Sequence, residues 1–540
     1  MKILFFIVSI FFIIIGFKEV YANNNIRLNI DMSVSVSTVS DLYNAGYDGW
    51  GDITNPKAVG FLNDVGIKYC RIVMELNELC GDKYGEYNWQ YVTAKDKGLG
   101  FIGRIKQIKS NGWEPVIVFS YHGGENKIPK WFYGENNDNN ERSWTRYNAD
   151  GLLETNGVGN QLKIASDIAK DIVEKMALEG FSGLYWETIY EMGPEMPLVD
   201  IHYNIAKGIR EGDLNAKIIG PATWPGWSVE EKFVKPFLEK YDADLLDYVS
   251  VHWYGTNEHE LWDMGFDPNK DFVKMSDRQY LNYLMSMTNK YANWSVSLRN
   301  LLDNPELNHK NKKIGIMFTE FDVVAQSPYM KNPENLNWPN YSSESDCYVN
   351  TNFFGSIWCV SVLTNMAKNG KADAMFKFNT RNYYGIIDNA GDDDFLRLPI
   401  WFAWKLLQDK AKLVKGVEIL KTSDENVPET LEITAVKSGE KLNLIVINKS
   451  FKDENADIYI YNGNLKNTTK YLFNEDRTAS FIGRKPGASE EGKFEFFPND
   501  NKNLLCLEPV EIIKTEENKK NTFLNNMHLP AMSITVLSFE

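Results

Sequence analysis

Two glutamates stand at the ends of strongly apolar runs, which is an unusual place for a charged side chain. Glu191 ends the run "GLYWETIYE" and Glu320 follows "IGIMFT". A carboxylate at the edge of a buried strand is easily desolvated. Because desolvating a charge costs free energy, a purely structural role for such a side chain is hard to explain. Two carboxyl groups in different environments are the minimum equipment for cleaving a glycosidic bond, with one as acid and the other as nucleophile or base.

Further polar and aromatic side chains occur near the ends of other apolar runs, and eight of them are candidates for binding a substrate. They are Arg71, His122, Tyr190, Trp224, His252, Tyr254, Lys377 and Arg381. Strand ends meet solvent and are often polar without any function, so this alternative stays open for each residue taken singly. Lys377 and Arg381 would suit an acidic sugar or simply a solvated strand end. Aromatic rings such as Trp186, Trp227 and Trp253 suit the apolar faces of sugars but also suit a core.

Other motifs argue against a cofactor or a metal. The segment 98–103, "GLGFIG", fits a dinucleotide-binding pattern, but the preceding "QYVTAKDK" is not a buried strand. The histidines form no His-Glu-x-x-His motif, and neither a Gly-x-Ser-x-Gly elbow nor a phosphate-binding loop is present. We therefore expect neither a metal nor an organic cofactor.

The elements that must position these residues alternate between strands and helices. We predict strands at 26–32, 67–74, 114–121, 182–191, 216–222, 247–254, 313–321 and 372–379, and helices at 99–110, 161–180 and 277–303. Eight strands joined by helical crossovers predict an α/β fold, a closed (β/α)8 TIM barrel over residues 23–412. A doubly wound open sheet uses the same alternation and remains the alternative. After the segment 398–412 only strands and polar turns follow, which predicts a smaller antiparallel β-sandwich domain over 413–540.

The beginning of the chain and its composition indicate where the protein works. Residues 1–22 combine Lys2, an apolar run and a small residue at Ala22, as a secretory signal peptide does, so we expect a secreted, cell-surface or periplasmic protein with no later membrane span. The formal net charge of −15 argues against nucleic acid as a partner. Five cysteines in 540 residues are too few for a disulfide framework.

Several segments resemble family 39 glycoside hydrolases and the wider retaining (β/α)8 clan. The segment "YWETIYEMG" resembles the family's "WEIWNEP", and "MFTEFDV" resembles its nucleophile strand. The segments "PVIVFSY", "DYVSVHWYG" and the closing "LPAMSITVLSFE" extend the resemblance over about 26–540. It implies a carbohydrate substrate and double displacement, with Glu191 as acid/base and Glu320 as nucleophile, about 5 Å apart. In this mechanism we expect His252 and Tyr254 to hold Glu320 ionised and oriented.

The family pattern is broken at one informative position. Tyr190 stands where the family has an Asn that contacts the sugar 2-hydroxyl, and Met192 replaces the Pro that follows the acid/base. An inactive carbohydrate-binding protein on a glycosidase scaffold is therefore an alternative, as is a structural surface protein without a deep cleft. We expect Glu187 to be buried support, paired with Arg71, and Glu195 to be solvated loop.

Overall fold

The computed structural model describes most of the chain between residues 26 and 539. The described segments are 26–47, 52–90, 98–120, 161–192, 197–223, 229–241, 243–255, 277–323, 353–381, 385–389, 395–463, 465–474, 504–514 and 521–539, with a few shorter pieces between them. The predicted signal peptide, His122, Trp224 and Glu195 lie outside the described residues.

Eight parallel strands close into a barrel, as the alternation of strands and helices predicts. In order around the barrel they are β2 (Asp41–Tyr47), β3 (Tyr69–Glu75), β4 (Glu114–Ser120), β5 (Tyr185–Glu187), β6 (Lys217–Thr223), β7 (Tyr248–Tyr254), β8 (Gly315–Asp322) and β9 (Ala374–Lys377). The barrel closes by pairing of β9 with β2. The closed sheet rules out the doubly wound alternative and confirms the predicted barrel.

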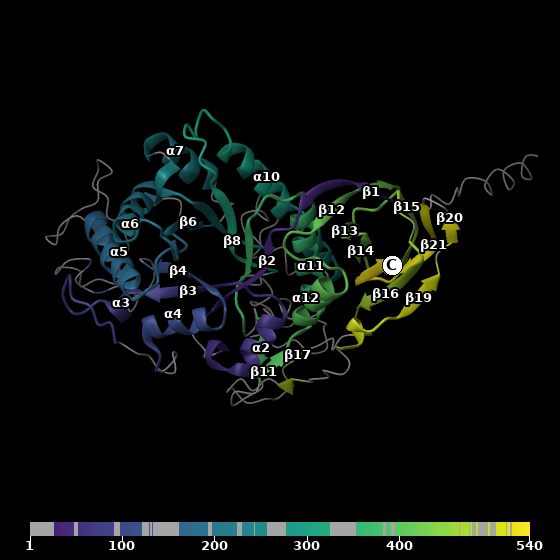
Figure 1. The fold of residues 1–540 in the computed structure, drawn as a ribbon, viewed down its shortest axis with the longest axis horizontal. Helices are drawn as coiled ribbons and strands as arrows, with labels where there is room; N and C mark the ends of the chain where they lie inside the picture. The colour runs from purple at the N-terminus through teal and green to yellow at the C-terminus, as the bar shows by residue number, and fades with distance from the viewer. Residues whose placement is uncertain are drawn as a thin grey trace, which may run out of the picture.

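The first barrel strand is not the one that the sequence predicts. The segment at 26–32 forms β1 (Ile26–Thr38), which pairs with β12 (Glu418–Glu425) and β15 (Glu454–Tyr461) in the C-terminal sheet. Figure 1 shows this N-terminal strand among strands from the end of the chain. The prediction of 26–32 as a barrel strand was wrong because strand periodicity does not identify the partner of a strand. The boundary at 412/413 stays a prediction.

The strand that takes its place, β2, has the polar sequence "DLYNAGY" and is therefore hard to recognise as a buried strand. Its Asn44 is fully buried and its side-chain oxygen accepts hydrogen bonds from the backbone N–H groups of Lys68 and Tyr69. A Cβ on Gly46 would lie 2.3 Å from the carbonyl oxygen of Phe378, so only glycine fits there.

Helices cover the outside of the barrel. The longer ones are α2 (Pro56–Asp64), α4 (Gly100–Ser110), α5 (Gln161–Leu178), α6 (Leu198–Gly212), α7 (Lys235–Tyr241), α9 (Asp277–Ser286), α10 (Lys290–Leu302), α11 (Phe353–Asn369) and α12 (Pro399–Asp409). Short helical segments lie at Asp52–Thr54, Leu76–Leu79, Glu230–Val234, Ala243–Leu245 and Leu505–Leu507. The single helix predicted at 277–303 is broken at 287–289, between α9 and α10. Among the described residues, no helix has the length and apolarity that crossing a membrane requires.

The C-terminal part forms a ten-stranded sheet in which all pairs except β1–β15 are antiparallel. The order is β19 (Glu511–Lys514), β16 (Asn467–Phe473), β22 (Ser533–Phe539), β14 (Lys441–Asn448), β13 (Leu431–Ser438), β12, β1, β15, β21 (Asn521–Leu529) and β20 (Glu516–Asn518). Small hairpins pair β10 (Ile387–Asn389) with β11 (Phe395–Arg397) and β17 (Ile482–Gly483) with β18 (Glu495–Phe496).

The two faces of this sheet have different neighbours. Leu28, Leu444 and Leu524, from widely separated strands, share one core, so the sheet curls around it as a sandwich does. On the opposite face, Ile445 and Val536 join the core that α11 and α12 share with the barrel. The cysteines that the structure describes, Cys70, Cys80, Cys359 and Cys506, are buried and form no disulfide with one another.

Candidate active site

Glu320 is a buried carboxylate at the carboxyl end of β8, held by side chains from two other strands of the barrel. Only 1% of the residue is exposed. Arg71 on β3 donates from Nη1 to its Oε1 at 2.7 Å, and the Tyr254 hydroxyl on β7 donates to its Oε2 at 2.8 Å. Both carboxylate oxygens are thus engaged, which fixes the orientation of the side chain inside the barrel mouth.

Glu187 lies beneath this carboxylate and anchors Arg71. The guanidinium donates from Nε to Glu187 Oε2 at 2.8 Å, and its Nη2 lies 2.7 Å from the same oxygen. Thr319, directly before Glu320, donates its hydroxyl to Glu187 Oε1 at 2.8 Å. The predicted pairing of Glu187 with Arg71 is confirmed. Thr319 is a residue that sequence reasoning missed, and its only signal is its place next to Glu320.

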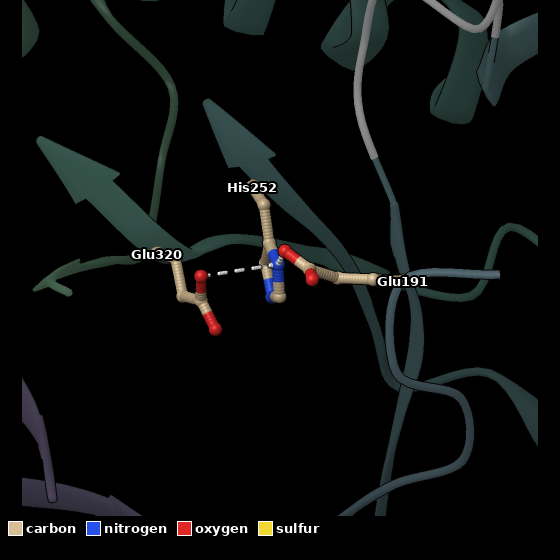
Figure 2. Close-up of side chains that lie close together, drawn as sticks. All are labelled: Glu191, His252 and Glu320. Carbon is tan, nitrogen blue, oxygen red and sulfur yellow. Dashed lines mark hydrogen bonds and ion pairs between the residues drawn. The ribbon is translucent and has the colours of Figure 1, made fainter. Parts of the chain in front are cut away.

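His252 connects the two predicted catalytic glutamates (Figure 2). Its Nε2 lies 3.1 Å from Arg71 Nη2, and a guanidinium can only donate, so Nε2 accepts. The proton of the neutral ring is therefore on Nδ1, which lies 2.8 Å from Glu191 Oε1 and 3.4 Å from Glu320 Oε2. Arg71 thus sets the tautomer of His252, and the ring directs its N–H towards Glu191.

Glu191 differs from Glu320 in its exposure and in its backbone. About 30% of its side chain is exposed, so it meets solvent where Glu320 does not. Its φ of +50° lies in the left-handed region, which is strained for a residue with a Cβ. Its N–H donates to the carbonyl of Ala222, itself at φ +51° just before the end of β6. This contact fixes the chain where it leaves β5 and presents Glu191 to the mouth of the barrel.

The electrostatic environment separates the two carboxyl groups further. Burial raises the pKa of Glu320 above its ordinary value, and Glu191 raises it further, while His252 and Arg71 act in the opposite direction. Burial also raises the pKa of Tyr254, so its phenol stays protonated and donates to Glu320. One glutamate is therefore enclosed and hydrogen-bonded, and the other is accessible.

The same three side chains are close enough to be considered as metal ligands. Each residue offers one possible ligand atom, an oxygen from Glu191 and from Glu320 and a nitrogen from His252. These three atoms lie within 4.8 Å of one another. However, the Nδ1 of His252 carries a proton and its Nε2 faces a guanidinium, so neither nitrogen offers a lone pair. The charge of Arg71, 2.7 Å from Glu320, would also repel a cation. The donor set fits hydrogen bonding better than metal coordination.

Tyr190 packs against the cluster. Its ring lies 5.5 Å from the guanidinium carbon of Arg71 and 5.9 Å, edge-on, from the ring of His252. The negative charge of Glu320, followed by burial, raises the pKa of the Tyr190 phenol. The residue that departs from the family pattern is therefore in contact with the cluster.

Two other predicted residues have partners outside the cluster. Lys377 pairs with Asp322 at 2.5 Å, and both side chains are only 1% exposed, so Lys377 has no surface for a substrate contact. Arg381 is half-buried, with its guanidinium carbon 5.9 Å from the ring centre of Phe395. Sequence reasoning missed Asp322, although it is the second acidic residue in "TEFD".

The two aromatic residues of the described barrel strands that we considered as sugar platforms lie in the core. Trp186 stacks on Phe119 at 5.3 Å, and Trp253 stacks on Tyr291 at 4.7 Å. They are 1% and 5% exposed. Their side chains point outward from the barrel towards the helices, because successive residues of a strand alternate between its two faces. For Trp253 the expectation of a sugar contact was wrong.

Known structures share this architecture at low sequence identity. No protein-family model matches the sequence, and no curated protein matches it. A family 51 alpha-L-arabinofuranosidase from Bifidobacterium longum is 13% identical, with 95% of this chain and 99% of that chain covered and a TM-score of 0.59. A GH39 enzyme from Xanthomonas axonopodis pv. citri is 13% identical over 95% and 97%, with a TM-score of 0.54. A GH30 endoxylanase from Clostridium papyrosolvens C71 is 11% identical over 95% and 100%, with a TM-score of 0.50. The chain therefore has the barrel and β-domain fold of these glycoside hydrolases.

Proposed function

We propose that the protein is a secreted retaining glycoside hydrolase that acts on an oligo- or polysaccharide. The observation that carries the proposal is a pair of glutamates, one just after the fourth barrel strand and one at the carboxyl end of the seventh, with one oxygen of each within 4.8 Å of the other. Retaining enzymes hold their two carboxyl groups about 5 Å apart, whereas inverting enzymes leave about 6.5–9.5 Å for a water molecule. The short separation favours double displacement.

The contacts of the two glutamates support different roles. Glu320, oriented by Arg71 and Tyr254, would attack the anomeric carbon and form a glycosyl-enzyme bond. Glu191, which is accessible, would protonate the leaving oxygen and then activate water as a base. After Glu191 gives up its proton, the His252 Nδ1–H stabilises the carboxylate that remains. The arrangement thus serves both steps.

Retention can be tested with the purified chain on aryl glycosides and polysaccharides of xylose, arabinose and glucose, with the product anomer followed by NMR. We expect the product to keep the anomeric configuration of the substrate. Glu320→Gln should lose about 10⁴-fold or more in turnover, because the nucleophile is gone. Glu191→Gln should lose about 10²- to 10⁴-fold in kcat/KM on polysaccharide, but much less in kcat/KM on a dinitrophenyl glycoside, because that leaving group needs no proton when the glycosyl-enzyme forms.

Glu211→Gln is a matched control, because Glu211 is a half-exposed glutamate on α6 whose ion pairs with Lys170 and Lys207 are each 4.0 Å long. This variant should keep the activity of the natural chain. An inverted product would refute the retaining mechanism.

A second candidate function is carbohydrate binding without catalysis. It is favoured by Tyr190, whose ring lies against Arg71 and His252. In that case no glycan would be turned over, and the natural chain and Glu320→Gln would bind sugars with equal affinity. Turnover that depends on Glu320 would refute it.

A further inference from the structure

A half-open cavity of about 770 Å³, lined mostly by residues with polar side chains, lies where the barrel helices meet the C-terminal sheet. Its walls come from α9, α10, the break between them and α11 on one side, and from β13, β15 and the segments 429–430 and 449–452 on the other. It shares no residue with the glutamate cluster. Its volume is within the range of about 300–1,000 Å³ that is usual for ligand sites.

The helical wall carries five asparagine amides and one serine hydroxyl, which together form the amide row of the cavity. Asn282 and Ser286 are four residues apart on α9, Asn289 lies in the break between the two helices, and Asn293 is on α10. On α11, Asn365 and Asn369 are four residues apart and also line the cavity. Each amide offers two N–H donors and a carbonyl acceptor.

The floor of the cavity is a buried ion pair whose hydrogen bonds are satisfied. Lys449 lies 2.5 Å from Glu432, with side chains 6% and 14% exposed. The lysine also donates to the carbonyl of Met285 at 3.1 Å and to the hydroxyl of Thr288 at 3.2 Å. Its three protons are therefore in use, and it offers no free positive charge to an anion.

Glu432 is equally engaged. Its Oε1 also accepts from the Asn365 side chain at 2.9 Å, and its Oε2 accepts from the Ser361 hydroxyl. The floor is therefore preorganised and nearly neutral, which keeps Asn365 in a fixed orientation at the cavity.

We propose that this cavity binds a neutral oligosaccharide at a site separate from the two glutamates. A ligand of this kind carries many hydroxyl groups, which match the amide row, Thr430 and Ser450 as donors and acceptors. The half-buried Phe451 at the wall offers a ring to the apolar face of a sugar. An apolar ligand would desolvate the amides without replacing their hydrogen bonds. A polyanion would meet Glu429 and Glu454, and the exposed Lys452 offsets only one of these two charges. The inference goes beyond the proposed function and does not require catalysis.

Hydrogen–deuterium exchange of the full-length Glu320→Gln chain tests the proposal, because this variant removes turnover and leaves the cavity intact. The probes are xylotetraose, cellotetraose and arabinotriose at increasing concentration. With at least one of them we expect slower exchange in 282–293, 365–369 and 449–454. Adding Asn293→Ala and Asn369→Ala should weaken binding at these segments about tenfold, because two amides are lost.

Asn300→Ala is the matched control, because Asn300 is an exposed residue of α10 outside the cavity, and it should leave binding unchanged. Alanine favours helix over asparagine, so lost binding would not reflect an unfolded helix. The proposal is overturned if none of the three probes protects the cavity segments at millimolar concentration. It is also overturned if the double Asn variant binds as tightly as its parent. Both measurements report binding at the cavity, so their outcome does not depend on whether the protein is a hydrolase.

Discussion

Replacing Arg71 by methionine tests how the centre of the barrel is held together. Arg71 is 4% exposed and is the cation between Glu187 and Glu320, with contacts of 2.7 Å to each. Methionine fills a similar volume but leaves two buried carboxylates without their counter-ion. We therefore expect the variant to be less stable and the size of the loss to depend on pH.

The magnitude follows from the burial of these groups. Removing one partner of a buried ion pair destabilises a protein by about 3–5 kcal/mol, and we expect a loss of this size at pH 7. A stranded carboxylate can escape the penalty by taking up a proton, at about 1.4 kcal/mol for each unit of pKa shift. The folded variant then binds more protons than the unfolded chain between pH 7 and about 4. Its stability relative to the natural chain must therefore rise as the pH falls, leaving about 1 kcal/mol of loss near pH 4.

Urea unfolding at pH 7 and pH 4 measures both effects. A second variant that combines Arg71→Met with Glu187→Gln removes one of the stranded charges and should recover part of the stability at pH 7. Equal losses at the two pH values would contradict the argument from uncompensated charge. So would a loss below about 1 kcal/mol at pH 7 or a double variant that is less stable than the single one.

Three further predictions concern other buried groups. In urea unfolding at pH 7, Lys377→Met should destabilise the chain by about 3–5 kcal/mol, because Asp322 is fully buried and its pKa is raised to about 6. The double variant Lys377→Met with Asp322→Leu should lose clearly less stability. The acid limb of the pH profile of kcat/KM should lie above the ordinary glutamate pKa, because burial raises the pKa of Glu320, which must be ionised to attack. Burial lowers the pKa of His202 to about 4, so its folded state resists protonation, and stability should fall as the pH drops from about 6.5 to 4. In thermal melts over the same pH range, the stability of the His202→Gln variant should depend less on pH than that of the natural chain.

The fold class could be predicted from the sequence because it depends on local periodicity. Seven of the eight barrel strands lie within the predicted segments or overlap them, and the change from helices to strands after residue 412 is visible in the sequence. The error at the N-terminus has a physical reason. Whether β1 pairs with β2 or with β15 depends on residues more than 400 positions away, and no local pattern carries that information.

The sequence by itself determined which residue types stand at the strand ends, and it predicted Glu191 and Glu320 as candidate catalytic residues and Glu187 as a buried partner of Arg71. Only the tertiary structure decided which of these side chains meet. Successive residues of a strand alternate between its two faces, and this alternation turns Arg71 into the barrel, where it meets Glu320. Lys377 forms a buried pair with Asp322 instead. The tautomer of His252 likewise depends on Arg71 from another strand. Hydrogen bonds between segments distant in the sequence arise from packing, so the amide-lined cavity and the contacts of the glutamates could be seen only in the folded chain.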